Sequence, residues 1–137
     1  MPWSVVKRKL WLEKKALAGQ FLEETEANLK NLAETKLLAT KTYDLAAGAD
    51  QLQLFPEETG RQIDRAYEKV ATINDALVKY QKFRSSAASD PDFDKKCSEF
   101  QQFLVWYRGG LTATLENLRA RLSEEMKEPP EQERMSH

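Results

Sequence analysis

Histidine and cysteine are the side chains of this sequence that could carry acid–base or nucleophilic chemistry. The one histidine, His137, is the last residue of a polar C-terminal segment, where no fixed geometry for proton transfer is expected. The one cysteine, Cys97, lies between Phe93 and Phe100 at helical spacing, and no histidine is available to activate it. We therefore expect Cys97 to pack in the core, and we predict a protein without enzymatic activity.

Acidic residues form two groups that could be read as catalytic or metal-binding carboxylates. A di-metal site in a helical bundle needs Glu and His at matched inward positions, whereas the inward positions here are predicted to be Leu, Phe, Val, Ile and Tyr. We expect the carboxylates to be solvated or to lie in a first helical turn, and they are Glu23, Glu24, Glu26, Glu57 and Glu58. The sequence thus predicts no catalytic, metal-binding or cofactor-binding residue, and it implies no small-molecule substrate.

Basic and tryptophan side chains are interleaved at the N-terminus in an unusual way. As candidate contacts to a membrane or a partner we select Trp3, Lys7, Arg8, Lys9, Trp11, Lys14 and Lys15. Tryptophan beside cations on an amphipathic helix suits the headgroup region of an anionic bilayer. The same residues could instead pack on the bundle or on a second subunit. Binding to a nucleic-acid backbone is the weakest alternative, because no known nucleic-acid-binding motif accompanies these residues and the net charge of the chain is −1.

Three long helices must position these residues. The hydrophobic periodicity predicts them near residues 4–35, 56–84 and 90–127. Ser4 and Asp90 suit N-caps, and Pro56 suits the first turn of a helix. A short helix near Tyr43, capped by Thr40 or Thr42, is expected in the connector. Gly109 and Gly110 interrupt the last helix with a bend or a close helix contact, a full break being the alternative.

The predicted fold is all-α, an antiparallel up-down-up bundle of three long helices whose short connector helix closes one end. Residues 1–127 form one domain, and residues 128–137 form a disordered acidic tail. Asn28 and Asn74 lie on or beside the apolar stripes, where we expect them to pair helices or to be partly exposed rather than to bind a ligand. Hydrophobic residues at 41% and charged residues at 31% favour a globular protein over a disordered or membrane-embedded one. Cytoplasmic localisation is expected.

Several short segments between about residues 23 and 77 carry a resemblance to other proteins. They read Glu-Glu-Thr-Glu-Ala-Asn-Leu-Lys-Asn-Leu from Glu23, Lys-Thr-Tyr-Asp from Lys41, Leu-Gln-Leu-Phe-Pro from Leu52, Ala-Tyr from Ala66 and Ile-Asn from Ile73. This order resembles uncharacterised bacterial helical-bundle proteins, and no functional residue carries over from them. The resemblance implies a membrane anchor ahead of the first helix in many members. This chain has only the basic, tryptophan-bearing start, which leaves peripheral attachment open.

From these patterns the leading expectation is a non-catalytic helical module for protein interaction or oligomerisation. Its partner would be another protein or a second copy of the chain. The alternative is a peripheral membrane-binding protein that uses residues 1–15, at the inner face of the membrane.

Overall fold

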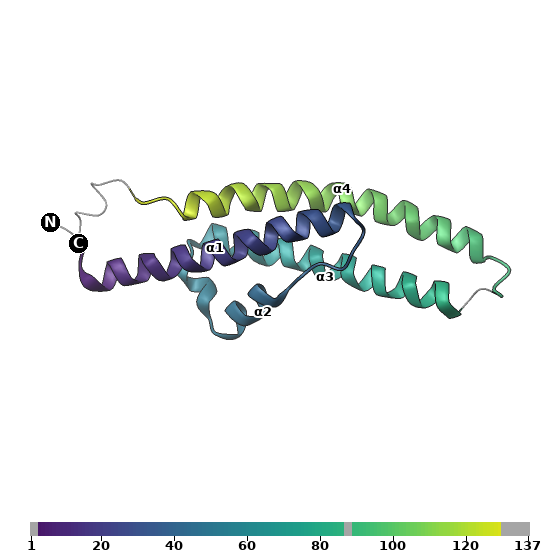
Figure 1. Cartoon of the computed structure of the whole chain (residues 1–137), viewed down its shortest axis with the longest axis horizontal. Coiled ribbons are helices and arrows are strands. Elements are labelled where there is room, and N and C mark those ends of the chain that lie inside the picture. The colour runs from purple at the N-terminus through teal and green to yellow at the C-terminus, as the bar shows by residue number, and fades with distance from the viewer. Residues whose placement is uncertain (1–2, 87–88, 130–137) are drawn as a thin grey trace.

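The computed structural model describes residues 3–86 and 89–129, and over these residues it contains helices and no strands (Figure 1). The elements are α1 (Val5–Ala33), α2 (Lys41–Gly48), the 3-10 helix η1 (Gln51–Leu54), α3 (Glu57–Ser86) and α4 (Phe93–Glu125). The expected all-α class and all four expected helices are confirmed. The predicted tail falls mostly on residues 130–137, which lie outside the described residues.

Local capping sets the two ends of α1. The Ser4 Oγ accepts a hydrogen bond from the Lys7 N–H at 3.1 Å, as expected of an N-cap. At the other end the Lys36 N–H donates to the Asn31 carbonyl at 2.8 Å and the Thr35 N–H to the Leu32 carbonyl at 3.2 Å. This pattern is a Schellman motif, and it places the non-glycine residue Thr35 at a left-handed φ of 57°.

The long helix α4 begins two residues later than the sequence suggests. Asp92 rather than Asp90 occupies the N-cap position. Asp90 instead accepts the Asp92 N–H at 2.7 Å and pairs with Lys96 at 2.9 Å, and both interactions lower the pKa of its carboxyl. Gly109 and Gly110 are exposed within an unbroken α4, and a Cβ at either would meet no other group within 4 Å. Of the expected alternatives, the close helix contact and the full break are therefore wrong, and the bend stays a prediction.

The helix directions differ from the expected up-down-up order, which is not confirmed. α1 and α3 run the same way, and α4 runs back along both (Figure 1). Glu24 of α1 bonds to Tyr67 of α3, and two to three turns further along both helices Leu32 lies in the same groove as Leu77. Residues 34–56 carry the chain back along α1, so α3 starts near the level of Lys14 and not beside the first turns of α1.

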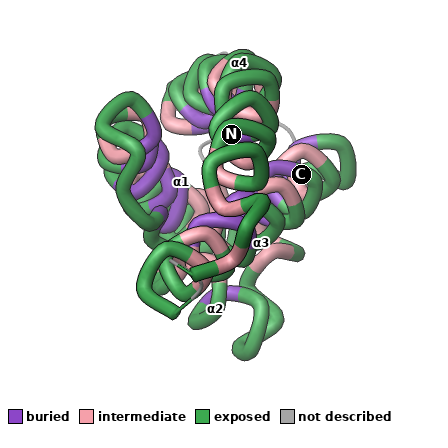
Figure 2. Tube along the Cα trace, turned by 90° about the vertical axis from the view of Figure 1, so that its right-hand side faces the viewer, coloured by how far each residue is buried: buried purple, intermediate pink, exposed green. Residues whose placement is uncertain are grey.

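The core lies where the three long helices turn toward one another (Figure 2). Its fully buried side chains repeat at three- and four-residue spacing, which places them on one stripe of each helix. They include Phe21, Ile63, Val70, Leu111, Leu115, Leu118 and Leu122. Phe21 contacts Phe55 and Tyr67 edge-on, at ring-centroid distances of 6.1 and 5.9 Å. This contact fixes the end of the connector against α1.

Two asparagines hold the extended part of the connector between α1 and α3. Asn28 donates to the Ala39 carbonyl at 2.9 Å and accepts the Ala39 N–H at 2.7 Å. Asn74 donates to the Leu38 carbonyl at 2.9 Å and accepts the Leu38 N–H at 2.8 Å. The amides thus satisfy the backbone of a segment that has no strand partner. Neither asparagine pairs the helices directly, because the connector passes between them, whereas the expected alternative of partial exposure is confirmed for Asn74.

The short helix α2 packs on the flank of α1 and α3, instead of closing one end of the bundle as expected (Figure 1). Glu24 accepts the Thr42 N–H at 2.9 Å in the first turn of α2, and it accepts the Tyr67 hydroxyl at 2.6 Å. Glu24 is 9% exposed, so its expected place on a solvated face is wrong. It lies three residues after Phe21 and therefore falls on the core stripe.

Candidate functional site

The first turns of α1 project beyond the rest of the bundle (Figure 1). Lys14 lies opposite Glu125, the last residue of α4, so the residues before Lys14 extend past the end of that helix. Val5 is 85% exposed and Val6 67% exposed, and Leu10 and Leu12 are also exposed. Val6 and Leu10 continue the helical spacing of the buried residues Leu17 and Phe21. We call residues 3–13 the N-terminal overhang.

The two tryptophans of the overhang pack on each other. Their ring centroids are 5.3 Å apart, and the Lys15 ammonium lies 5.2 Å from the Trp11 ring, within cation–π range. The Trp11 Nε1 is buried and has no hydrogen-bond acceptor among the described residues. The pair therefore forms a small apolar cluster on a basic helix.

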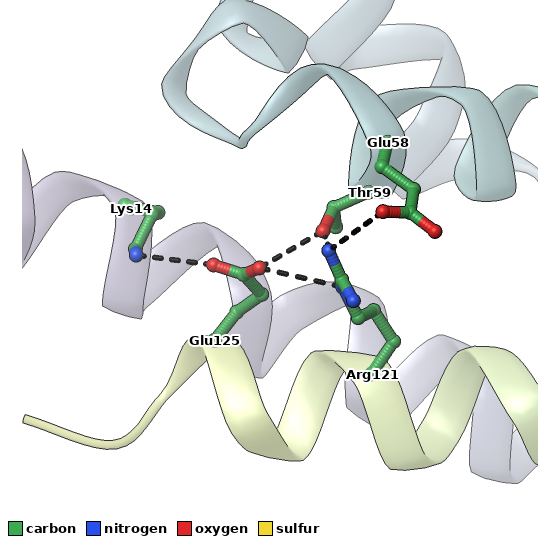
Figure 3. A network of polar contacts seen from close by, with 5 residues as sticks. All are labelled: Lys14, Glu58, Thr59, Arg121 and Glu125. Carbon is green, nitrogen blue, oxygen red and sulfur yellow. Dashed lines mark hydrogen bonds and ion pairs between the residues drawn. The ribbon is translucent and has the colours of Figure 1, made fainter.

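A polar network anchors α1 where the overhang begins, and it includes one of the predicted contact residues (Figure 3). Lys14 pairs with Glu125 at 3.0 Å. The Thr59 hydroxyl donates to Glu125 at 2.9 Å and accepts the Arg121 Nε–H at 2.7 Å, and Arg121 lies 3.8 Å from Glu58. Lys14 is thus committed to an ion pair that joins α1 to α4 and, through Thr59, to α3.

The structure therefore divides the predicted contact residues. Lys7, Arg8, Lys9 and Lys15 are exposed, whereas Trp3, Trp11 and Lys14 are half-buried. Glu125 was missed as an anchor, although it lies three residues after Leu122 and so falls on the core stripe of α4.

A groove lies at the opposite end, where α3 and α4 continue past the end of α1. It has a volume of about 390 Å³. Its floor contains Leu32, Ile73, Leu77 and Leu104, all of which are buried. Val105, which is 62% exposed, lies on its edge. We call this the tip groove.

Cationic side chains line the rim of the tip groove, and no carboxylate is among its lining residues. Arg84 lies over the Tyr80 ring at 5.7 Å, and Arg108 donates to the Thr35 hydroxyl at 3.5 Å. Lys36 pairs with the neighbouring Glu34 at 3.0 Å. No described carboxylate forms an ion pair with Arg84 or Arg108. The rim therefore carries positive charge that the described chain does not neutralise.

Sequence reasoning missed the tip groove because it treated the three long stripes as covering one another. The predicted helix lengths gave no signal for it, because the first predicted helix is at least as long as the second. The groove arises because α1 is offset along the bundle, which leaves the outer turns of α3 and α4 uncovered. Next to the groove, Trp106 is 75% exposed and contacts Phe103 and Tyr107, with ring centroids 6.4 and 6.2 Å from its own. This exposed aromatic cluster extends the uncovered apolar surface of α4.

The buried polar cluster around α2 is not suited to proton transfer near neutral pH. Burial and the hydrogen bond to Glu24 raise the pKa of Tyr67 far above its usual value. The hydrogen bond to Asp64 raises the pKa of Tyr43 to about 12, and burial contributes. The two rings stack with centroids 4.6 Å apart. These contacts hold α2 in place.

Within residues 3–86 and 89–129 no group of three or more His, Cys, Asp and Glu side chains could hold a metal ion. Cys97 lies near the start of α4 and is only partly buried, so its expected place in the core is wrong. No helix of the described part is long and apolar enough to cross a bilayer.

Comparisons with protein-family models, with curated proteins and with solved structures find no match to this chain. The resemblance to bacterial helical-bundle proteins therefore stays a prediction. The surfaces described above carry the functional argument.

Proposed function

We propose that this protein is a non-catalytic helical interaction module that associates with a second copy or with another helical protein. The observation that carries the proposal is the apolar surface left uncovered at both ends of the bundle. Val5, Val6 and Leu10 are exposed at one end, and Val105 and Trp106 at the other. Contiguous exposed apolar surface is typical of sites that bind another macromolecule.

Two of these residues continue the core stripe of α1, and Val105 and Trp106 lie beside the buried Leu104 of α4. Val6 and Leu10 repeat the spacing of the stripe that is buried from Leu17 onward. Burying one such side chain contributes about 1.5–3 kcal/mol. Association through either end would bury several of them at once, which is enough to offset part of the entropy cost of docking.

Sedimentation velocity over a range of protein concentrations tests the proposal. We expect an average mass that rises with concentration, and a smaller rise after Val6→Ser with Leu10→Ser or after Val105→Ser with Trp106→Ser. Glu116→Ser, at an exposed position of α4, serves as the control and should leave the mass unchanged. A wild-type protein that stays monomeric throughout, together with no binding to any helical partner, would contradict the proposal.

We propose as a second candidate function the peripheral attachment of the N-terminal overhang to an anionic membrane surface on the cytoplasmic side. The specific support is the tryptophan pair on a projecting helix whose Lys7, Arg8 and Lys9 are exposed. Each basic residue near such a surface contributes about 1 kcal/mol to the free energy of membrane binding. Tryptophan side chains favour the interface between the bilayer and water.

Co-sedimentation with phosphatidylserine-containing vesicles tests this second candidate. Binding should fall steeply after Lys7→Glu, Arg8→Glu and Lys9→Glu together, and also after Trp3→Ala with Trp11→Ala. The control is Lys95→Glu, at an exposed position in the first turn of α4, which should leave vesicle binding unchanged. Lys69 is less suitable because it donates a hydrogen bond to Thr114. Binding that is absent, or that survives both sets of substitutions, rejects membrane attachment through the overhang.

A further inference from the structure

We propose that the tip groove binds an acidic amphipathic helix of a partner protein, which lies in line with α1 and completes a three-helix packing beyond Ala33. This inference rests on the proposed interaction function, and it names the surface and the chemistry of the partner. The partner helix would present an apolar stripe to the floor of the groove and carboxylates to its rim.

The shape of the tip groove supports a helix as its occupant. On α3 the groove residues Ile73, Leu77, Tyr80 and Arg84 follow one another at spacings of four, three and four. On α4 Leu104, Val105 and Arg108 lie on one face as well. Two neighbouring helices with such faces form the seam into which a third amphipathic helix packs. The α3 face spans about 16 Å, which corresponds to roughly 11 residues of a partner helix.

Charge complementarity specifies the partner's sign. Arg84 and Arg108 come from different helices and border the groove on two sides, and neither forms an ion pair with a described carboxylate. Lys36, from the segment after α1, also lines the groove but is paired with Glu34. Arg84 and Arg108 can each pair with a carboxylate in two-pronged geometry. Complementary charge at the edge of an apolar seam gives specificity and speeds association.

The same charge argues against the N-terminal overhang of a second copy as the occupant. That segment is helical and about as long as the groove, and it carries uncovered apolar side chains. It carries Lys7, Arg8 and Lys9, however, and these would face the cations of the rim. Like charges brought together at an interface disfavour the complex. A helix with acidic flanks satisfies both the apolar floor and the basic rim.

Fluorescence anisotropy with two synthetic probes tests the assignment. The acidic probe is a labelled alanine-based helix of about 14 residues with a leucine stripe at helical spacing and glutamates beside it. The basic probe replaces each glutamate by lysine. We expect the acidic probe to bind the full-length protein, and Arg84→Glu with Arg108→Glu to weaken it about tenfold or more. The reversed variant should prefer the basic probe.

Arg119→Glu, on the exposed face of α4, is the matched control and should leave the affinity for the acidic probe unchanged. Circular dichroism confirms that each variant is folded. Equal binding of the two probes by the wild type, or equal weakening by Arg119→Glu, would overturn the assignment. So would binding of anionic vesicles that is lost on the Arg84 and Arg108 reversal, which would assign the groove to lipid.

If neither probe binds, the groove assignment fails. Sedimentation velocity then separates this failure from failure of the proposed function, since self-association that persists would leave the interaction module intact and locate its surface elsewhere.

Discussion

At the scale of single residues, the polar side chains that lie on core stripes do structural work. Asn28 and Asn74 occupy positions that leucine could fill, yet each satisfies both backbone groups of one connector residue. The two hydrogen bonds of each amide offset the cost of removing the amide from water. If the amide is lost, a backbone N–H or carbonyl is left without a hydrogen-bond partner. These asparagines therefore determine where the connector passes.

Replacing Asn74 by Asp should destabilise the protein by about 2–3 kcal/mol. The substitution removes the donor to the Leu38 carbonyl and sets a carboxylate oxygen against it. Urea denaturation at neutral pH measures the free energy of unfolding. Asn117→Asp, at an exposed position on α4, is the control and should change that free energy by less than about 0.5 kcal/mol. Equal effects of the two substitutions would show that Asn74 does not hold the connector.

Replacing Thr35 by Gly should stabilise the protein by about 1 kcal/mol. Thr35 ends α1 at a left-handed φ of 57°, a conformation that costs a non-glycine residue about 1–2 kcal/mol. The gain is smaller than this cost because glycine loses more freedom on folding and the contact to Arg108 is lost. Thermal and urea unfolding measure the change. A lower stability would mean that the Arg108 contact outweighs the backbone strain.

At the scale of elements, α2 is short and depends on partners outside itself. An eight-residue helix is not stable alone, so its position rests on Glu24 at its first turn and on the Tyr43 and Tyr67 stack. Thr40 occupies the N-cap position, but its hydroxyl donates to Asp44 at 2.9 Å instead of accepting a backbone N–H. The carboxylate of Glu24 takes over that role beside the positive end of the helix.

Alkaline titration should show how strongly α2 is held. The hydrogen bond to Asp64 raises the pKa of Tyr43 from 10.0 to about 12, so between these pH values the folded state keeps a proton that the unfolded state loses. The stability linked to Tyr43 is therefore complete below pH 10.0 and is lost as the pH rises toward 12. Tyr43→Phe should reduce this loss. The measurements are tyrosinate absorbance and urea unfolding across that range, and identical pH profiles for the two proteins would contradict the argument.

At the scale of the whole molecule, the direction of α3 determines which surfaces are left uncovered. Because α1 and α3 start at the same end, α1 can be offset from both of its neighbours. The offset leaves the overhang at one end and the tip groove at the other. An antiparallel α1 and α3 joined by a tight turn would instead have placed the end of α1 beside the start of α3.

Spin-label distances should report this direction. With Cys97 replaced by alanine, labels at positions 30 and 79 should be much closer than labels at positions 30 and 61, replacing the exposed residues Lys30, Lys79 and Arg61. The two α3 positions are separated by roughly 27 Å along the helix. Double electron–electron resonance measures both distances. A shorter distance to position 61 would establish the up-down-up order instead.

The sequence by itself determined the helices, because the spacing of apolar residues and the caps at Ser4 and Pro56 are local signals. It also indicated the basic, tryptophan-bearing N-terminal segment, although not that this segment projects beyond the bundle. Only the tertiary structure decided the direction of α3, the burial of Glu24 and Glu125, and the use of Asn28 and Asn74. Each of these depends on contacts between residues far apart in the chain. A periodic stripe shows which face of a helix turns inward, but it does not show what that face meets or where its neighbour ends.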